Sequence, residues 1–106
     1  MQASGRYLYV LFCCQQAIEK ALKALIVERT GKFPPRIHNL PRLAKPAKLE
    51  LDAAQMDFLA DLSNYYIQTR YPEEISSMAT SLTREKAEQT LRMTEDMATW
   101  LLSMLK

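Results

Sequence analysis

The stretch Cys14-Gln-Gln-Ala-Ile-Glu-Lys-Ala-Leu-Lys-Ala-Leu25 decides how this chain folds. Its apolar residues recur every three or four positions, which is the spacing of one face of an α-helix. The spacing extends in both directions and predicts a first long helix over residues 4–29, because no proline and no glycine after Gly5 interrupts it. Arg29 and Gly31 are typical of a helix end, since a cation suits the last turn and glycine adopts the left-handed conformation that closes a helix.

A polar flank runs along this otherwise apolar helix and consists of Gln15, Gln16, Glu19, Lys20 and Lys23. One interpretation is a solvated face on which Glu19 pairs with Lys23, four residues further on. The other is a buried polar network that links the helix to His38 or Arg70 elsewhere in the chain. The first interpretation accounts for the charges but not for the glutamines, and both remain open at this point.

A short connector helix is expected next. Asn39 can cap a helix whose first turn tolerates Pro41, and Pro46 stops it. Asp52 and Gln55 then have the spacing of a capping box, and the apolar positions that follow predict a second long helix. That helix must end near residue 70, because the proline at position 72 disfavours helix just before it. Residues 73–82 are expected to form a polar loop.

The last helix is expected to begin after Thr83, which is a favourable cap. Its apolar positions alternate steps of four and three, as in helices that pack side by side in coiled coils. These positions are Ala87, Leu91, Thr94, Ala98, Leu101 and Leu105. The sequence therefore predicts an all-α fold, an antiparallel up-and-down helical bundle of three long helices and one short connector, in a single domain over residues 1–106.

Composition is consistent with a globular helical protein and excludes several classes. Apolar residues make up 48% of the chain and charged residues 25%, and two glycines leave little room for hairpins or phosphate-binding loops. The net charge of +2 is too small to indicate nucleic-acid binding by itself. No apolar run is long enough to span a membrane and no signal peptide is recognisable, so we expect a cytoplasmic protein without membrane contact. A core of this size is marginal unless the helices are long or subunits associate, so oligomerisation is possible; the homodimer that we expect is implied by the family resemblance described below.

No metal site and no other cofactor is expected. Cys13 and Cys14 are adjacent, so their side chains diverge on a helix and do not form a disulfide. Two thiols and one histidine also fall short of the usual zinc ligand set. We interpret both cysteines as small buried hydrophobic residues.

Three motifs together resemble the HEPN domain of bacteria and archaea. The run from Gln15 to Lys23 is similar to the first signature of that family, the residues 38–40 (His-Asn-Leu) to the second, and the residues 70–72 (Arg-Tyr-Pro) to the third. The resemblance implies a helical bundle that commonly dimerises and is often paired with a minimal nucleotidyltransferase, many pairs behaving as toxin and antitoxin. It also implies that active members are metal-independent RNases.

Two features depart from the family pattern. Family members usually have a further helix before a turn like Gly5-Arg6-Tyr7, so we expect a bundle that is one helix short, with an open apolar groove that a second copy or a partner covers. The RNases of the family carry an arginine followed, after four to six residues, by a histidine. Neither Arg29 nor Arg36 stands at that distance from His38, the only histidine.

The chemistry of RNA cleavage nominates one pair of catalytic residues. Metal-independent cleavage needs a base for the ribose hydroxyl and a cation for the developing phosphorane charge. His38 and Arg70 suit these tasks, although the favoured interpretation of the pair is structural: a hydrogen-bonding histidine ahead of a helix, and an arginine that binds carbonyl groups at a helix end. Nucleotide or phosphate binding is assigned to Lys20, Lys23, Arg36 and Tyr71, and a polar network to Gln15, Gln16, Glu19 and Asn39. Tyr65 and Tyr66 are interpreted as core or interface residues.

Three functions are consistent with these assignments. The first is a dimeric nucleotide- or RNA-binding module that acts beside a nucleotidyltransferase partner in a toxin–antitoxin-like pair. The second is a metal-independent endoribonuclease toxin in which His38 is the base and Arg70 holds the phosphate. The third is a structural partner that binds only protein through an exposed apolar seam.

Overall fold

The computed structural model describes residues 3–105, and every regular element in this range is helical. None of these helices has the length and apolar character needed to cross a membrane. In chain order the elements are α1 (Ala3–Thr30), α2 (Leu40–Ala44), α3 (Ala53–Ser63), the 3-10 helix η1 (Ile67–Thr69), α4 (Pro72–Thr80) and α5 (Arg84–Ser103).

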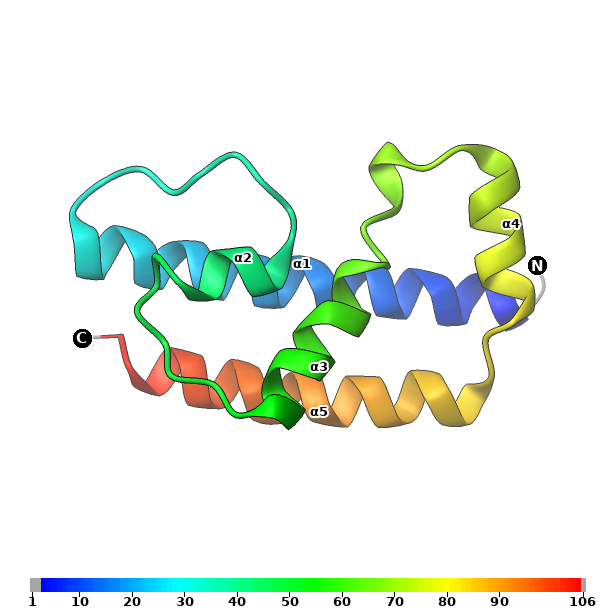
Figure 1. Ribbon diagram of the computed structural model, residues 1–106. Helices are drawn as coiled ribbons and strands as arrows, with labels where there is room; N and C mark the ends of the chain where they lie inside the picture. Colours follow the sequence, from blue (N-terminus) through cyan, green and yellow to red (C-terminus); the bar gives the residue numbers. More distant parts are fainter. Residues whose placement is uncertain (1–2, 106) are drawn as a thin grey trace.

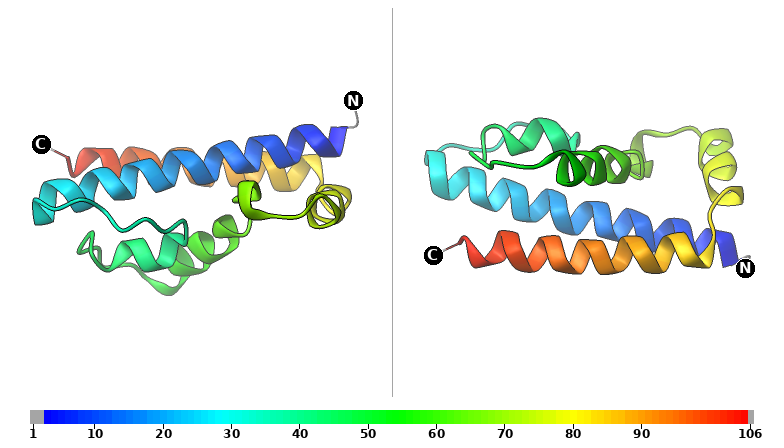
Figure 2. Two further views of the ribbon diagram at one scale, coloured as in Figure 1. Left: turned by 90° about the horizontal axis from the view of Figure 1, so that it is seen from above. Right: turned by 60° about the horizontal axis from the view of Figure 1, so that its bottom comes forward.

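α1 and α5 form the long body of the molecule, which extends 42 Å along its main axis. The two helices lie side by side and run in the same direction (Figure 1). α3, which comes between them in the sequence, runs in the opposite direction. The ends of both helices meet where the guanidinium of Arg29 donates a hydrogen bond to the sulfur of Met104 at 3.5 Å. α2 and α3 cover the C-terminal half of α1 from the other side, and α4 lies across its N-terminal end (Figure 2).

The hydrophobic core sits between α1, α2, α3 and α5. Every one of the four helices contributes side chains that are almost completely removed from solvent, among them Ile18, Leu22, Leu25, Leu40, Leu43, Leu59, Leu62 and Leu101. Each such side chain contributes about 1.5–3 kcal/mol by leaving water. The predicted connector is confirmed: the side chain of Asn39 caps α2 by accepting from the N–H of Arg42 at 3.2 Å.

The second long helix was predicted to run to about residue 70, and this is wrong. α3 begins with the expected capping box of Asp52 and Gln55 but ends at Ser63. The N–H groups of Tyr65 and Tyr66 bond to carbonyls three residues back, which tightens the last turn and ends the helix. The hydroxyl of Ser63 meanwhile accepts from the N–H of Leu40 at 2.7 Å, so a tertiary contact holds the chain at this point.

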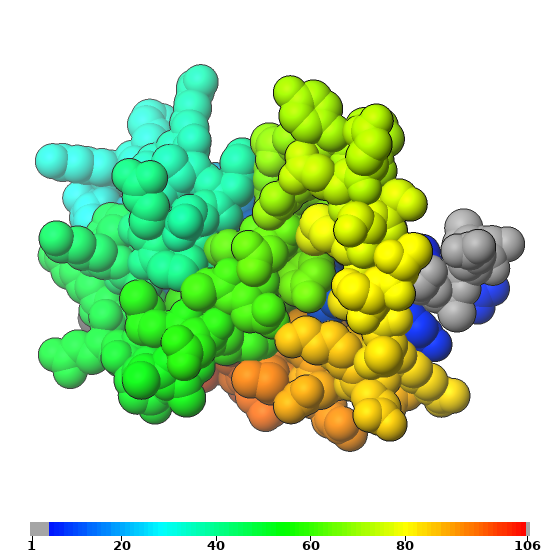
Figure 3. Space-filling view, turned by 45° about the vertical axis from the view of Figure 1, so that its right-hand side comes forward, coloured from blue at the N-terminus to red at the C-terminus, as the bar shows by residue number. Residues whose placement is uncertain are grey.

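Residues 73–82 were predicted to be a polar loop, and most of them are instead α4. Its sequence carries ordinary helix-start signals: Pro72 in the first turn, followed by Glu73 and Glu74, whose charges complement the helix dipole. The bundle therefore has two long helices and three shorter ones within residues 3–105, rather than three long and one short. Figure 3 shows α4 (yellow) beside the segment that leads into it.

The apolar stripe predicted for α5 is only partly the buried one. Thr83 caps the helix as predicted, but the buried residues of α5 are Ala87, Thr90, Thr94, Met97 and Leu101. Leu91 is 41% exposed, and Ala98 and Leu105 are half-buried. Thr90 and Met97, which each stand one position before a predicted residue, are buried, so Leu91 and Ala98 lie at the edge of the buried face. α5 thus keeps a second apolar face beside the buried one.

Candidate functional site

A polar network is buried where α1 passes the segment before α2. Gln15 is fully buried, and its side-chain amide donates to Glu19 Oε1 at 2.8 Å and to the backbone carbonyl of His38 at 3.3 Å. Gln16 donates to the amide oxygen of Gln15 at 2.8 Å, and the ammonium of Lys23 donates to Glu19 Oε2 at 3.1 Å. The pair of Glu19 and Lys23 therefore exists, but its carboxylate end is buried rather than solvated.

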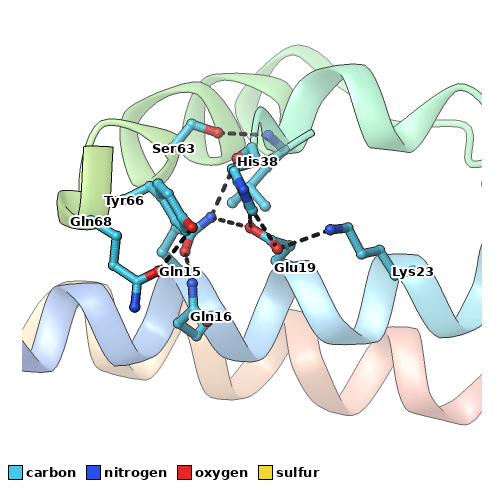
Figure 4. Close-up of polar contacts among 9 residues, drawn as sticks. Gln15, Gln16, Glu19, Lys23, His38, Ser63, Tyr66 and Gln68 are labelled. Atoms are coloured by element: carbon cyan, nitrogen blue, oxygen red, sulfur yellow. Dashed lines mark hydrogen bonds and ion pairs between the residues drawn. The ribbon is translucent and has the colours of Figure 1, made fainter. Parts of the chain in front are cut away.

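Glu19 is the centre of this network (Figure 4). The residue is only 7% exposed. Burial by itself raises the pKa of its carboxyl, but hydrogen bonds from Gln15, His38 and Lys23 outweigh burial and hold the pKa below its ordinary value of 4.5. The side chain is therefore an ionised carboxylate at neutral pH.

The imidazole of His38 is oriented by two contacts. Its Nδ1 lies 3.0 Å from each carboxylate oxygen of Glu19. Its ring stacks on the ring of Tyr66, with a centroid distance of 3.9 Å and an interplanar angle of 9°. Since a carboxylate only accepts, the neutral imidazole carries its proton on Nδ1 and keeps the lone pair of Nε2 for other partners. This is the tautomer that a general base at Nε2 requires.

His38 and Arg70 border one cavity of about 370 Å³. The other lining residues are Asn39, Ser63, Asn64, Tyr66, Thr69 and Glu74. The side chain of His38 is 41% exposed, so the ring is held from α1 on one side and reaches solvent on the other. The cavity brings together residues from the connector, the end of α3 and the start of α4.

The guanidinium of Arg70 is held at the edge of this cavity. One nitrogen donates to Glu74 Oε2 at 3.1 Å, and another donates to the backbone carbonyl of Asn64, just after α3, at 3.2 Å. The second contact is the kind of carbonyl binding at a helix end that a structural role implies. The side chain is 34% exposed, which leaves part of the cation accessible.

The remaining nominated residues do not line the cavity. Tyr71 is 72% exposed, and Arg36 is exposed on the loop before α2. Lys20 is also exposed, and its helical spacing places it with Cys13, Ala17 and Ala24 on the outer face of α1 rather than beside Glu19.

The sequence did not reveal that Tyr66 and the chain that follows α3 contribute to the cavity. Tyr66 was interpreted as a core or interface residue because it falls within an extended helical pattern. Its stacking on His38 and its place in the cavity depend on the early end of α3. Serine and asparagine at positions 63 and 64 were the available signal, since both favour helix ends. Within residues 3–105, no group of three or more histidine, cysteine or carboxylate side chains is placed to hold a metal ion.

The pH dependence of stability tests the Glu19 network. The pKa of the Glu19 carboxyl is lower in the folded state, so as the pH falls this carboxyl is protonated in the unfolded chain before it is protonated in the folded one. The contribution of Glu19 to the free energy of unfolding is therefore complete above about pH 4.5 and is lost as the pH falls below it. Glu19→Gln is expected to reduce the loss of stability on acidification, and to lower the free energy of unfolding at neutral pH by about 1 kcal/mol. Urea denaturation across the acid range measures both effects.

Glu74→Gln is the comparison variant for this measurement. The pKa of Glu74 is lowered as well, chiefly by its hydrogen bond from Arg70, but its carboxyl is exposed, so its removal should change the loss of stability on acidification less. Superimposable profiles for the wild type and Glu19→Gln would contradict the network.

Comparison with known proteins assigns the family. The family model described as the HEPN domain matches residues 1–104, which is nearly the whole chain. No significant match was found among curated proteins or among solved structures. The chain belongs to the HEPN domain family.

Proposed function

We propose that this protein is a nucleotide- or RNA-binding module in which the cavity at His38 and Arg70 receives a phosphate-bearing ligand. Membership of the HEPN family indicates a nucleotide- or RNA-related module. The observation that carries the proposal is the shared cavity, which joins a cation and a carboxylate-oriented imidazole from distant parts of the chain. Its volume of about 370 Å³ lies within the range of small-ligand sites.

The lining residues suit such a ligand. Arg70 offers guanidinium donors to phosphate oxygens, and guanidinium geometry matches phosphate. Asn39, Ser63 and Asn64 add neutral polar groups that can orient a ribose or a base. Two further cations lie outside the lining: Lys23, which is paired with Glu19, and the exposed Arg36.

Calorimetric titration tests the proposal directly. Uridine and adenosine monophosphates and a short single-stranded RNA are titrated into the wild-type protein. Saturable binding is expected, and it should weaken in Arg70→Ala. The absence of any heat with all three ligands, together with a tight complex with a protein partner, would instead favour a purely structural protein-interaction role.

We further propose that the protein forms a homodimer through the outer faces of α1 and α5. A groove of about 440 Å³ lies there, lined mainly by Tyr9, Val10, Cys13, Ala17, Leu91 and Ala98. Tyr9 is 65% exposed, and Cys13, which was expected to be buried, is exposed at the groove as well. Small apolar residues along α1 allow a second pair of helices to approach closely, and a two-fold axis would pair the groove with itself.

Leu91→Glu is expected to convert this dimer to a monomer, because it places a charge in the apolar contact. Light scattering after size exclusion measures the mass. Met93→Glu is the matched control: Met93 is also 41% exposed, but it lies on a different side of α5 and does not line the groove. A wild-type monomer, or equal dissociation in both variants, would contradict the proposed interface.

A nucleotidyltransferase-type partner is part of the same proposal. The resemblance described above supports a toxin–antitoxin-like pair, and exposed apolar surface remains for such a partner at the start of α1, next to α4. Co-expression with the adjacent reading frame, followed by purification of a stoichiometric complex, tests the pairing. Recovery of each protein alone would argue against it.

A second candidate function is metal-independent RNA cleavage, and one observation favours it. Glu19 holds Nδ1 of His38, which leaves Nε2 free to take a proton from a ribose hydroxyl, and Arg70 borders the same cavity as the cation. The sequence lacks the spacing of arginine and histidine that marks the RNases of the family. Cleavage would therefore depend on the tertiary pairing of His38 and Arg70.

A further inference from the structure

Positive charge is concentrated in one segment, residues 29–49. Six of the fourteen lysines and arginines lie there and none of the twelve acidic residues, so the segment carries +6 while the rest of the chain carries −4. The six are Arg29, Lys32, Arg36, Arg42, Lys45 and Lys48. The overall charge of +2 conceals this separation. A local cluster of this kind attracts polyanions even when the whole molecule is nearly neutral.

The segment begins at the end of the molecule where α1 ends. It leaves the end of α1, arches back as a loop and continues through α2 (Figures 1 and 2). Arg29 ties its two ends together by donating to the carbonyls of Ala47 and Lys48, each at 3.0 Å. The other five cations are exposed, and none of the ion pairs within residues 3–105 engages them. They therefore remain available to a ligand.

The loop also presents an aromatic ring to solvent. Phe33 is 97% exposed, with Lys32 before it and the sequence Pro34-Pro35-Arg36 after it. The two prolines restrict the backbone, which reduces the entropy lost when the loop is bound. An exposed ring between cations matches single-stranded nucleic acid, in which bases stack on aromatic rings and phosphates meet basic groups. An apolar protein surface would match Phe33 but would leave the flanking charges desolvated.

We propose that residues 29–49 form a binding surface for single-stranded RNA that leads into the cavity at His38. Phe33 stacks on a base, and Lys32, Arg42 and Lys45 contact backbone phosphates. The surface is continuous with the cavity, because His38 and Asn39 lie within the segment and line the cavity. This inference rests on the proposed function, since the strand places one of its phosphates in the cavity, and it makes a strand rather than a free nucleotide the preferred ligand.

The test compares two triple variants that lose the same charge. Lys32→Gln/Arg42→Gln/Lys45→Gln alters the surface, and Arg6→Gln/Arg84→Gln/Arg92→Gln removes three exposed arginines elsewhere. Anisotropy with a labelled strand of about twelve uridines is measured over a range of salt concentrations. The first variant is expected to bind the strand at least about tenfold more weakly. The slope of log K against log salt concentration should also become less steep by about 2, since each phosphate contact contributes about 0.7 to it. The control should change little.

Phe33 is tested separately from the charges. Phe33→Ala should weaken strand binding about tenfold, and Phe33→Tyr should retain it. Uridine monophosphate, which fills only the cavity, should bind all these variants like the wild type. Polyglutamate serves as a competitor that has charge but no bases, and it should compete poorly.

Four results would overturn the inference: equal losses in the two triple variants, no effect of Phe33→Ala, full competition by polyglutamate, or binding of the mononucleotide with no gain from the strand. Each of these leaves the cavity proposal standing. If the wild-type protein binds neither uridine monophosphate nor the strand, the proposed function fails as well.

Discussion

Arg70→Ala is expected to weaken binding of a phosphate-bearing ligand about 10- to 100-fold, because it removes charge-assisted hydrogen bonds to the phosphate. Calorimetry with uridine monophosphate and with a short RNA measures the loss. Arg70→Lys should recover only part of it, since an ammonium cannot reproduce the forked geometry of a guanidinium.

Two further variants make the Arg70 measurement specific. Arg84 forms the same kind of i,i+4 ion pair as Arg70, with Glu88 at 2.9 Å, but it does not line the cavity, so Arg84→Ala should bind normally. Glu74 accepts from the guanidinium of Arg70 and competes with any bound anion. Glu74→Gln should therefore strengthen binding. Weaker binding in Glu74→Gln, or unchanged binding in Arg70→Ala, would contradict a phosphate site at Arg70.

His38→Asn is expected to reduce RNA cleavage about 10²- to 10⁴-fold if the protein is the endoribonuclease of the second proposal, because it removes the general base. Asparagine keeps a side-chain N–H that can donate to Glu19, so the buried carboxylate is not left without this partner. His38→Ala should be equally inactive. The measurement is the rate of cleavage of a labelled RNA without added metal ions and with a chelator present.

A variant of Glu19 tests whether His38 is a positioned base or only a structural residue. Glu19→Gln keeps an acceptor for Nδ1 but replaces the carboxylate with a neutral amide that holds the ring less firmly, so the rate should fall. Circular dichroism and thermal melts of each variant establish that the fold persists. Cleavage by folded His38→Asn at the wild-type rate would exclude His38 as the base, and the binding function would be unaffected by that result.

Much of the helical architecture could be predicted from short-range signals. The end of α1 at Gly31, the capping of α2 by Asn39, the capping box of Asp52 and the cap at Thr83 all depend on residues within one turn of each other. Such signals act locally and are visible in one sequence. The two errors have different causes: the local start signals of α4 at Pro72 and Glu73 were overlooked, whereas the end of α3 was not visible in the local pattern. Apolar spacing continued past Ser63, but the helix ends there, at the residue whose hydroxyl accepts a hydrogen bond from the N–H of Leu40.

The candidate site, too, could be predicted only in part from the sequence. The sequence singled out Gln15, Glu19 and His38 by residue type and by family resemblance, but it left open whether the polar flank of α1 was solvated or buried. It assigned Lys20 and Tyr71 to phosphate binding, but neither lines the cavity of His38 and Arg70, since a residue's neighbours across a bundle depend on the rotation of each helix. Tyr66 could be recognised only after the end of α3 was known.

By itself, then, the sequence determined that this chain is helical, that it belongs with the HEPN domains, and which polar residues are out of place in an apolar helix. These properties follow from periodicity, capping and motif order, all of which are carried by neighbouring residues. Only the tertiary structure decided that Glu19 is buried against His38, that Tyr66 stacks on that ring, and that Arg70 borders the same cavity. The physical reason is that these contacts join residues from α1, the connector and the chain after α3. Their meeting depends on where α3 stops and how it packs, which no local pattern encodes.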